Sequence, residues 1–387
     1  MVFQLRTIFA GVLAFGILGA CTVLDTIDPR YDTINRSTAR ARNESIFLNI
    51  VRASRNDPLN FVALNRVGGT TQASGTLSAP TFLIGPAPLP VTIGRTTTFN
   101  DRSANATMSA INTFDISLLE TGNFYAALMA PVGLPDLATF IRQGYPRELL
   151  FWLFTDSVRI TRDGQTREVR NDPYDIKDCE ADPEHCFPRL IDIASTTGLT
   201  VETRVVVSGA KGDKSSRTTM GRLCFDPILA AKAKVDNPEP MSLQNPGLNR
   251  RPICGKDPWT EAGRRGGGSN SVQFASGPAR RGPVEFEITT RSTFGIYRYL
   301  GRILAAQMTE EIRLRDSRSY PGEDPRLLAV TQDASACFVD LVYEGEHYCV
   351  PERADNTKRI FGLLAQLLAL KTTVQDLGIT PVVRVSP

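Results

Sequence analysis

The cysteine pattern is the sequence feature that most constrains the fold of this 387-residue chain. Cys21 stands alone near the N-terminus, and the other six are Cys179, Cys186, Cys224, Cys254, Cys337 and Cys349. Because none of the spacings is C-x-x-C, disulfides are favoured over a structural metal site if the chain is exported. The simplest pairing joins sequence neighbours: Cys179–Cys186, Cys224–Cys254 and Cys337–Cys349. Six cysteines allow many other pairings, so the connectivity stays open.

Residues 1–20 have the pattern of a targeting segment, which is removed from a mature protein. Arg6 supplies a positive charge, and an apolar run extends from Ile8 to Leu18. This run is shorter than the roughly 20 apolar residues that a membrane-spanning helix needs. The segment therefore predicts a signal peptide and export of the chain.

The residues that end this run, Leu18-Gly19-Ala20-Cys21, resemble the lipobox of bacterial lipoproteins. The resemblance implies cleavage before Cys21, a diacylglyceryl thioether on its sulfur and usually an N-acyl chain such as palmitate. Because each buried acyl CH₂ contributes about 0.8 kcal/mol, two or three chains anchor a protein firmly. Thr22, in place of aspartate, resembles the outer-membrane address of enterobacterial lipoproteins. The expected location is the cell envelope, on the outer membrane facing the periplasm; the alternative is a plain secretory signal with an incidental cysteine.

Composition and periodicity predict an α+β fold. The 42% hydrophobic and 22% charged content excludes a disordered tail, a collagen-like fibre and a multi-span membrane protein. Apolar residues repeat at helical spacing in Ile46–Val51, Ile296–Leu304 and Ile360–Leu368, and they alternate as in strands in Val284–Thr289 and Leu199–Val207. No regular βαβ alternation is present, so strands and amphipathic helices are mixed.

We expect five parts along the chain: a lipoprotein signal peptide (1–20), a lipidated tether (21–35), an N-terminal α+β region (36–233), an irregular segment rich in Arg, Gly and Pro (234–282) and a C-terminal α+β region (283–387). Residues 68–107 form a second long irregular segment, rich in Gly, Thr, Ser and Pro. Irregular segments longer than about 15 residues are usually functional or disordered.

Individual elements follow from local patterns. Helices are expected from about 37 to 53, over 123–129 and 135–142, after Ser292 or Thr293, and after a cap at Asp355 or Asn356. The apolar run 149–154 is expected to be a buried core element. Strands are expected over 61–67, 82–84, 91–93, 157–160, 327–330 and 382–385, with a hairpin over 338–350 that turns at Glu344-Gly345.

Three blocks resemble a group of uncharacterised proteobacterial lipoproteins. They are Asn35–Ser37 with Ala41–Ser54 and Pro58–Phe61, then Arg291–Gly301, and Gly345–Tyr348 with Leu363–Leu368. The resemblance spans most of the mature chain and implies an envelope location. The group has no established activity, so the resemblance implies no catalytic residue.

One acidic loop is a weak candidate for a metal site. The loop closed by Cys179 and Cys186 is crowded with Asp178, Glu180, Asp182, Glu184 and His185, of which Asp178 directly precedes Cys179. Carboxylates with one imidazole can hold a divalent cation, but the order lacks the central Gly and terminal Glu of a calcium-binding EF-hand loop. An acidic, solvated loop is the favoured interpretation, so neither a metal nor another cofactor is predicted.

Three arginine pairs lie in the irregular segment: Arg250-Arg251, Arg264-Arg265 and Arg280-Arg281. Arginine binds phosphates and carboxylates in a bidentate manner, so these pairs are candidates for contact with an anion or a protein partner. Arg264–Asn270 lacks the Gly-Lys-Ser/Thr ending of a phosphate-binding loop. The net charge is only +3 and aromatic residues are sparse there, so nucleic acid is not an expected partner.

The catalytic inventory is small. The chain has two histidines, His185 and His347, and no Gly-x-Ser-x-Gly, His-Glu-x-x-His or Ser-x-x-Lys motif in a convincing context. His347 lies two residues from Cys349, which is a weak hint of a Cys–His pair, and a histidine beside a disulfide is the favoured alternative. No catalytic residue is predicted.

The leading hypothesis is a lipid-anchored envelope protein that acts by binding, as a structural or accessory component of an envelope assembly. Its expected partners are the membrane, through the lipid on Cys21, and an unidentified envelope protein. One alternative is an envelope hydrolase that acts on cell-wall or lipid material with carboxylate acid and base residues. Another is a lipoprotein that binds a small ligand.

Overall fold

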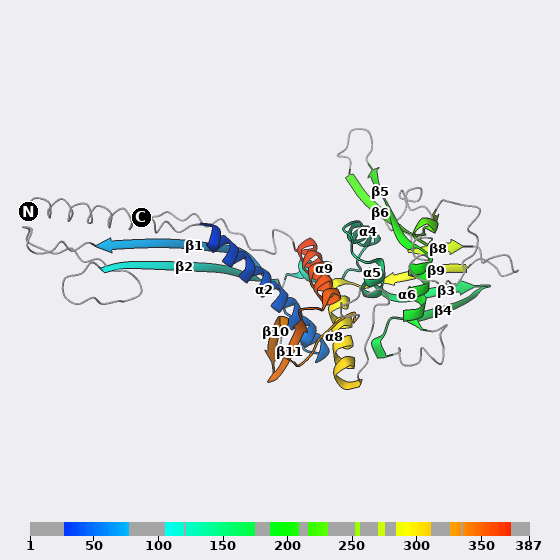
Figure 1. Cartoon of the computed structure of the whole chain (residues 1–387). Helices are drawn as coiled ribbons and strands as arrows, with labels where there is room; N and C mark the ends of the chain where they lie inside the picture. The colour runs from blue at the N-terminus through cyan, green and yellow to red at the C-terminus, as the bar shows by residue number, and fades with distance from the viewer. Residues whose placement is uncertain are drawn as a thin grey trace, which may run out of the picture. The chain divides into compact units, whose positions relative to one another are not determined.

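A computed structural model of the chain describes residues 27–76, 105–119, 121–174, 186–208, 216–230, 252–255, 270–274, 284–310, 326–333 and 336–372 (Figure 1). Helices and antiparallel sheets are mixed, which confirms the predicted α+β class. The helices are α2 (Ile27–Ser54), α3 (Gly122–Met129), α4 (Leu134–Arg142), α5 (Arg147–Phe154), α6 (Phe187–Thr196), α8 (Thr293–Glu310) and α9 (Asp355–Lys371). The strands are β1 (Val62–Thr76), β2 (Asn105–Leu118), β3 (Thr155–Arg162), β4 (Gln165–Arg170), β5 (Leu199–Ser208), β6 (Ser216–Phe225), β7 (Ile253–Cys254), β8 (Ser271–Phe274), β9 (Val284–Thr290), β10 (Cys337–Tyr343) and β11 (Glu346–Pro351).

The chain divides into two compact units. The first, Met1–Arg42 with Ala63–Ser117, includes the first part of α2 and the two-stranded sheet of β1 and β2. The second, Asn43–Val62 with Leu118–Pro387, includes the end of α2 and all the other elements. The side chains of the core and of the candidate site belong to this second unit.

The largest sheet of the second unit has the strand order β4-β3-β9-β8, with every neighbouring pair antiparallel. β3 and β4 form a hairpin through the turn Asp163-Gly164, where both residues have positive φ angles. β3 also pairs with β9, from Thr155↔Thr290 to Arg162↔Val284. Because β3 precedes and β9 follows residues 234–282, one sheet joins the chain on both sides of that segment.

The predicted core run forms α5, in which every residue from Leu149 to Phe154 is buried. The helix is apolar on all sides because other elements cover it from several directions. Phe154 stacks on Phe140 of α4 with ring centres 5.9 Å apart, and Trp152 meets Phe187 of α6 edge-on at 5.5 Å. α5 therefore lies at the centre of the second unit.

The helical stripes predicted from the sequence face this core. Ile46, Phe47, Ile50 and Val51 of α2 are all buried, as are five stripe residues of α8 and four of α9. Phe47 contacts Phe361 of α9 with ring centres 6.0 Å apart. Gly301 of α8 meets the end of α2 so closely that a Cβ on it would lie 2.5 Å from the Cβ of Ala53. This close approach requires glycine at position 301.

Several boundaries differ from the expectations. α2 begins at Ile27 rather than near Ser37, and an ion pair between Asp32 and Arg36, one turn apart, supports its early turns. β1 and β2 extend into the segment 68–107, and β7 and β8 lie within the segment 234–282, although both segments are expected from the sequence to be irregular. The expected strands at 82–84, 91–93 and 382–385 lie outside the described residues.

Residues Leu327–Val330 are buried but do not form the expected strand. Side chains at the start of α9 hold this segment, and a single antiparallel bridge joins the next residue, Thr331, to Cys349 of β11. Ala329 N donates to Thr357 Oγ1 at 2.8 Å, and Asn356 Nδ2 donates to Arg326 O at 3.5 Å. The N-cap residue of α9 is Ala354, whereas the sequence predicts Asp355 or Asn356 at this position.

Candidate functional site

Most of the site residues predicted from the sequence lie outside the described residues. They are Cys21, Cys179, Asp182, Glu184, His185, Arg250, Arg251, Arg264, Arg265, Arg280 and Arg281. The lipidation site, the weak metal candidate and the arginine pairs therefore stay predictions.

The described cysteines are all oxidised. The structure contains two of the pairs expected between sequence neighbours, Cys224–Cys254 and Cys337–Cys349. Cys186 is also disulfide-bonded, and Cys179, its expected partner, lies outside the described residues. Each of the two described pairs joins adjacent antiparallel strands, β6 to β7 and β10 to β11.

One surface feature of the second unit is the arm, defined as β5 and β6 together (Figure 1). The two strands pair without a bulge from Leu199↔Phe225 to Ser208↔Ser216. α4 packs on one face of the arm. A Cβ on Gly221 would lie 2.7 Å from the Cβ of Leu134, so only glycine allows this contact. Arg142 at the end of α4 donates from Nη1 to Thr203 Oγ1 at 3.0 Å.

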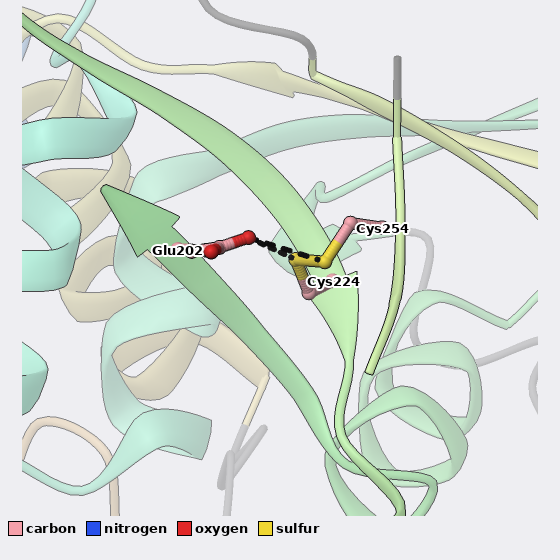
Figure 2. A group of neighbouring side chains, drawn as sticks. All are labelled: Glu202, Cys224 and Cys254. Carbon is pink, nitrogen blue, oxygen red and sulfur yellow. Dashed lines mark hydrogen bonds between the residues drawn. A yellow bond between two sulfur atoms is a disulfide. The ribbon is translucent and has the colours of Figure 1, made fainter. Parts of the chain in front are cut away.

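The base of the arm carries a second brace, shown in Figure 2. The Cys224–Cys254 disulfide ties β6 to β7, and Glu202 of β5 points at it. Glu202 Oε2 lies 3.5 Å from Cys254 Sγ and 3.9 Å from Cys224 Sγ. Because disulfide sulfurs carry no proton, they donate no hydrogen bond to the Glu202 carboxylate. The donor is instead Arg222, whose Nη2 and Nε lie 2.6 and 2.8 Å from Glu202 Oε2.

Reduction of the Cys224–Cys254 disulfide would change the chemistry at this end of the arm. Two thiols and the Glu202 carboxylate would then offer three ligand atoms within 4.8 Å of one another, a set that suits Zn²⁺. With the disulfide closed, both sulfurs are bonded to each other and the carboxylate is ion-paired with Arg222. In the oxidised chain this group therefore stiffens the arm.

The far part of the arm exposes apolar side chains. Val205 and Val207 lie on the face that α4 covers nearer the base, and they are 56% and 60% exposed. Their partners on β6, Thr219 and Arg217, are exposed as well. Two apolar side chains of the same strand face thus offer a small apolar surface that another molecule can contact. This surface is the candidate functional site.

A polar cluster joins the end of α2 to the β10–β11 hairpin. Arg55 Nη1 lies 2.7 Å from Glu344, and Arg55 Nη2 lies 2.8 Å from Glu346. Arg55 Nη2 also donates to Tyr348 Oη at 2.9 Å, and Tyr348 donates to Glu346 Oε2 at the same distance. Hydrogen bonds from Tyr348 and Arg55 lower the pKa of Glu346. Two carboxylates meet here on one cation, because Arg55 forms ion pairs with both Glu344 and Glu346, and this arrangement suits a structural tie.

His347 does not form the Cys–His pair that its position hinted at. Its Nε2 lies 3.8 Å from Asp340 Oδ2 on the neighbouring strand, and its Nδ1 lies 3.3 Å from Gln332 O. The sulfur of Cys349 is bonded to Cys337, so it offers no thiol for His347 to deprotonate. The alternative of a histidine beside a disulfide describes this hairpin.

Sequence reasoning missed Glu202 with Arg222, and Arg55 with Tyr348. An alternating strand signal was present for β5, but its partner strand and register decide which residue faces Arg222. No local pattern connects Arg55 with a tyrosine 293 positions later.

Comparisons with known proteins add no relative: no protein-family model, curated protein or solved structure matches the chain. Among the helices in the described parts of the chain, none combines the length and apolar character needed to cross a bilayer.

Proposed function

We propose that the chain is a lipid-anchored protein of a bacterial cell envelope that acts by binding, as a structural or accessory component of an envelope assembly. The observation that carries the binding role is the arm. Its base is held by α4, by a disulfide and by the Glu202–Arg222 ion pair, while Val205 and Val207 remain exposed. A surface held in shape before binding loses little conformational entropy when a partner docks.

The cysteines support an envelope location. Five cysteines are described and each is disulfide-bonded, which is the state expected in an oxidising compartment such as the periplasm. The lipobox Leu18-Gly19-Ala20-Cys21 supports anchoring at the membrane surface. Together these features favour a folded domain that is exported and tethered.

Anchoring is tested by labelling cells with a palmitate analogue. We expect the parent chain to incorporate the label and to sediment with membranes, and the Cys21→Ser variant to lose both properties. A Cys21→Ser chain that still incorporates label and sediments like the parent would show that the anchor is wrong.

Binding through the arm is tested with a photo-reactive residue in place of Val207. The matched control carries the same group at Gln165, an exposed position at the start of β4. We expect irradiated membranes to give a discrete crosslinked product from position 207 and none from position 165. Monomer alone from both positions, under several conditions, would contradict the binding role.

A further inference from the structure

The outer edge of β5 has backbone groups with no partner strand among the residues described. β5 is the first strand of the sheet β5-β6-β7, so only one of its edges is paired there. Asp226 N donates to Gly198 O across the continuation of the β5–β6 pair. Because hydrogen-bonded pairs alternate along an antiparallel ladder, the even-numbered residues of β5 bond to β6. The N–H and C=O groups of Val201, Thr203, Val205 and Val207 therefore point outward.

The lower end of this edge is occupied, since Arg147 Nη1 donates to Leu199 O at 2.9 Å. From Val201 to Val207 the strand contains no proline and no bulge, two of the features with which proteins usually block pairing at an exposed edge. Charged side chains are a third such feature, and the two in this stretch, Glu202 and Arg204, have opposite signs. α4 contacts a face of the arm, at Gly221 and Thr203.

We propose that β5 pairs antiparallel with β5 of a second copy of this chain, about a two-fold axis at Thr203. The inference rests on the proposed binding role of the arm and names the partner. Outward backbone groups sit on odd-numbered residues, and centring on Thr203 places odd residues opposite odd ones. Thr203 then faces Thr203 of the second copy, and Val201 faces the second copy's Val205. Three such pairs supply about six inter-strand hydrogen bonds.

Charge selects this register among the neighbouring ones. Around Thr203 the sequence reads Val201-Glu202-Thr203-Arg204-Val205, so Glu202 of each copy lies opposite Arg204 of the other. Centring on residue 202 would place glutamate against glutamate, and centring on residue 204 would place arginine against arginine. Opposite charges directly across an antiparallel pair stabilise it, and like charges destabilise it. In a closed two-fold dimer, the outer β5 edge of each copy is paired with the outer β5 edge of the other.

The first test places a cysteine on the proposed axis in the full chain, expressed with its leader and kept in its membranes. In Thr203→Cys the two new thiols face each other across a hydrogen-bonded pair, where Cα atoms lie about 5.5 Å apart and a disulfide can form. In the matched control, Val207→Cys, the two positions are about 27 Å apart in this register. We expect a dimer on non-reducing gels for position 203 and monomer for position 207.

Two results of this test would overturn the inference. Equal dimer yields at the two positions would indicate random collision. A Thr203→Cys chain whose new thiol reacts with maleimide but which stays monomeric would exclude the register. If the Thr203→Cys chain stays monomeric while the photo-reactive group at Val207 still crosslinks to another envelope protein, the binding role stands and self-pairing is wrong.

The second test adds no cysteine. Arg204→Glu places glutamate opposite Glu202 of the second copy at two symmetric positions, whereas Arg217→Glu makes the same charge change on β6 of the same arm. We expect Arg204→Glu to raise the dimer dissociation constant of the detergent-extracted full chain at least about tenfold, and Arg217→Glu to leave it near that of the parent. Light scattering during gel filtration reports both. Equal weakening by the two variants would contradict the Glu202–Arg204 register.

Discussion

The guanidinium of Arg291 lies 3.7 Å from the centre of the Tyr299 ring, and both side chains are buried. Arg291 follows β9 directly and hydrogen-bonds to the end of α5: its backbone N–H donates to Phe154 O, and Nη1 lies 3.3 Å from the carbonyl oxygens of Trp152 and Leu153. Its Nη2 donates to Asn171 O at 2.6 Å. One residue thus satisfies three carbonyl groups at the C-terminus of the core helix, where cations are favoured.

We expect Arg291→Met to lower the free energy of unfolding by about 2–4 kcal/mol, because buried carbonyl groups lose a charged donor. The measurement is the urea midpoint of the oxidised chain. Arg298→Met is the control, since Arg298 is exposed on α8, and it should change the free energy of unfolding by less than about 0.5 kcal/mol. Similar midpoints for the two variants would show that Arg291 is not a structural cation.

A second prediction concerns the contact between α8 and α2. Gly301→Ala places a methyl group 2.5 Å from backbone and side-chain atoms of Ala53, so a helix must shift. We expect a loss of about 1–3 kcal/mol in the free energy of unfolding, although alanine is the better helix former. Gly122→Ala in α3 meets no atom within 4 Å and should be neutral or stabilising. Thermal melts of both variants check this, and a neutral Gly301→Ala would contradict the close approach.

The Cys224–Cys254 and Cys337–Cys349 disulfides should contribute differently to the free energy of unfolding. Cys224–Cys254 closes a loop of sequence separation 30 and Cys337–Cys349 one of 12. Because the loss of unfolded-state entropy grows with loop length, the Cys224→Ser/Cys254→Ser variant should lose about 1 kcal/mol more stability than Cys337→Ser/Cys349→Ser. Urea unfolding of the two double variants tests the order. A larger loss for the β10–β11 pair would show that strain or packing outweighs loop length.

Most helices and the core could be predicted where burial leaves a periodic apolar signal, although α6, with Phe187, Ile191 and Ala194 buried, was missed. The stripes of α8 and α9, and the continuous run of α5, are buried as their patterns indicate. β4 and β6 were missed because most of β4 and the first half of β6 are exposed and polar, so no alternation marks them. The β1–β2 extension was missed for a related reason, since Gly, Thr and Ser are typical of loops.

The candidate site was predictable only in part. Neighbour pairing places Cys337 and Cys349 correctly because a tight hairpin turn brings near residues together. Glu202 reaches Arg222 only through the β5–β6 register, and register is a property of two strands rather than of one. The outward edge of β5 depends on that same register, so it became visible only with the structure.

The last prediction concerns acid stability at the Arg55 cluster. Hydrogen bonds from Tyr348 and Arg55 lower the folded-state pKa of Glu346 below its ordinary value of 4.5. A carboxyl group with a lowered pKa stabilises the fold fully above its unfolded pKa, and this contribution is lost as the pH falls through the folded pKa. Around and below pH 4.5, the ordinary value, the unfolded chain therefore binds more protons at Glu346 than the folded chain does, and stability declines.

In Arg55→Met one of the two lowering hydrogen bonds is removed, so the pKa of Glu346 should rise toward 4.5. We expect the urea midpoint to fall less between about pH 7 and about pH 3.5 in this variant than in the parent, although the variant is less stable at neutral pH. Tyr348→Phe removes the other hydrogen bond and should flatten the pH dependence in the same direction. Arg353→Met, a charge change at an exposed residue after β11, is the control and should keep the parental slope. A parental slope in Arg55→Met and Tyr348→Phe as well would show that Glu346 does not carry the acid sensitivity of this junction.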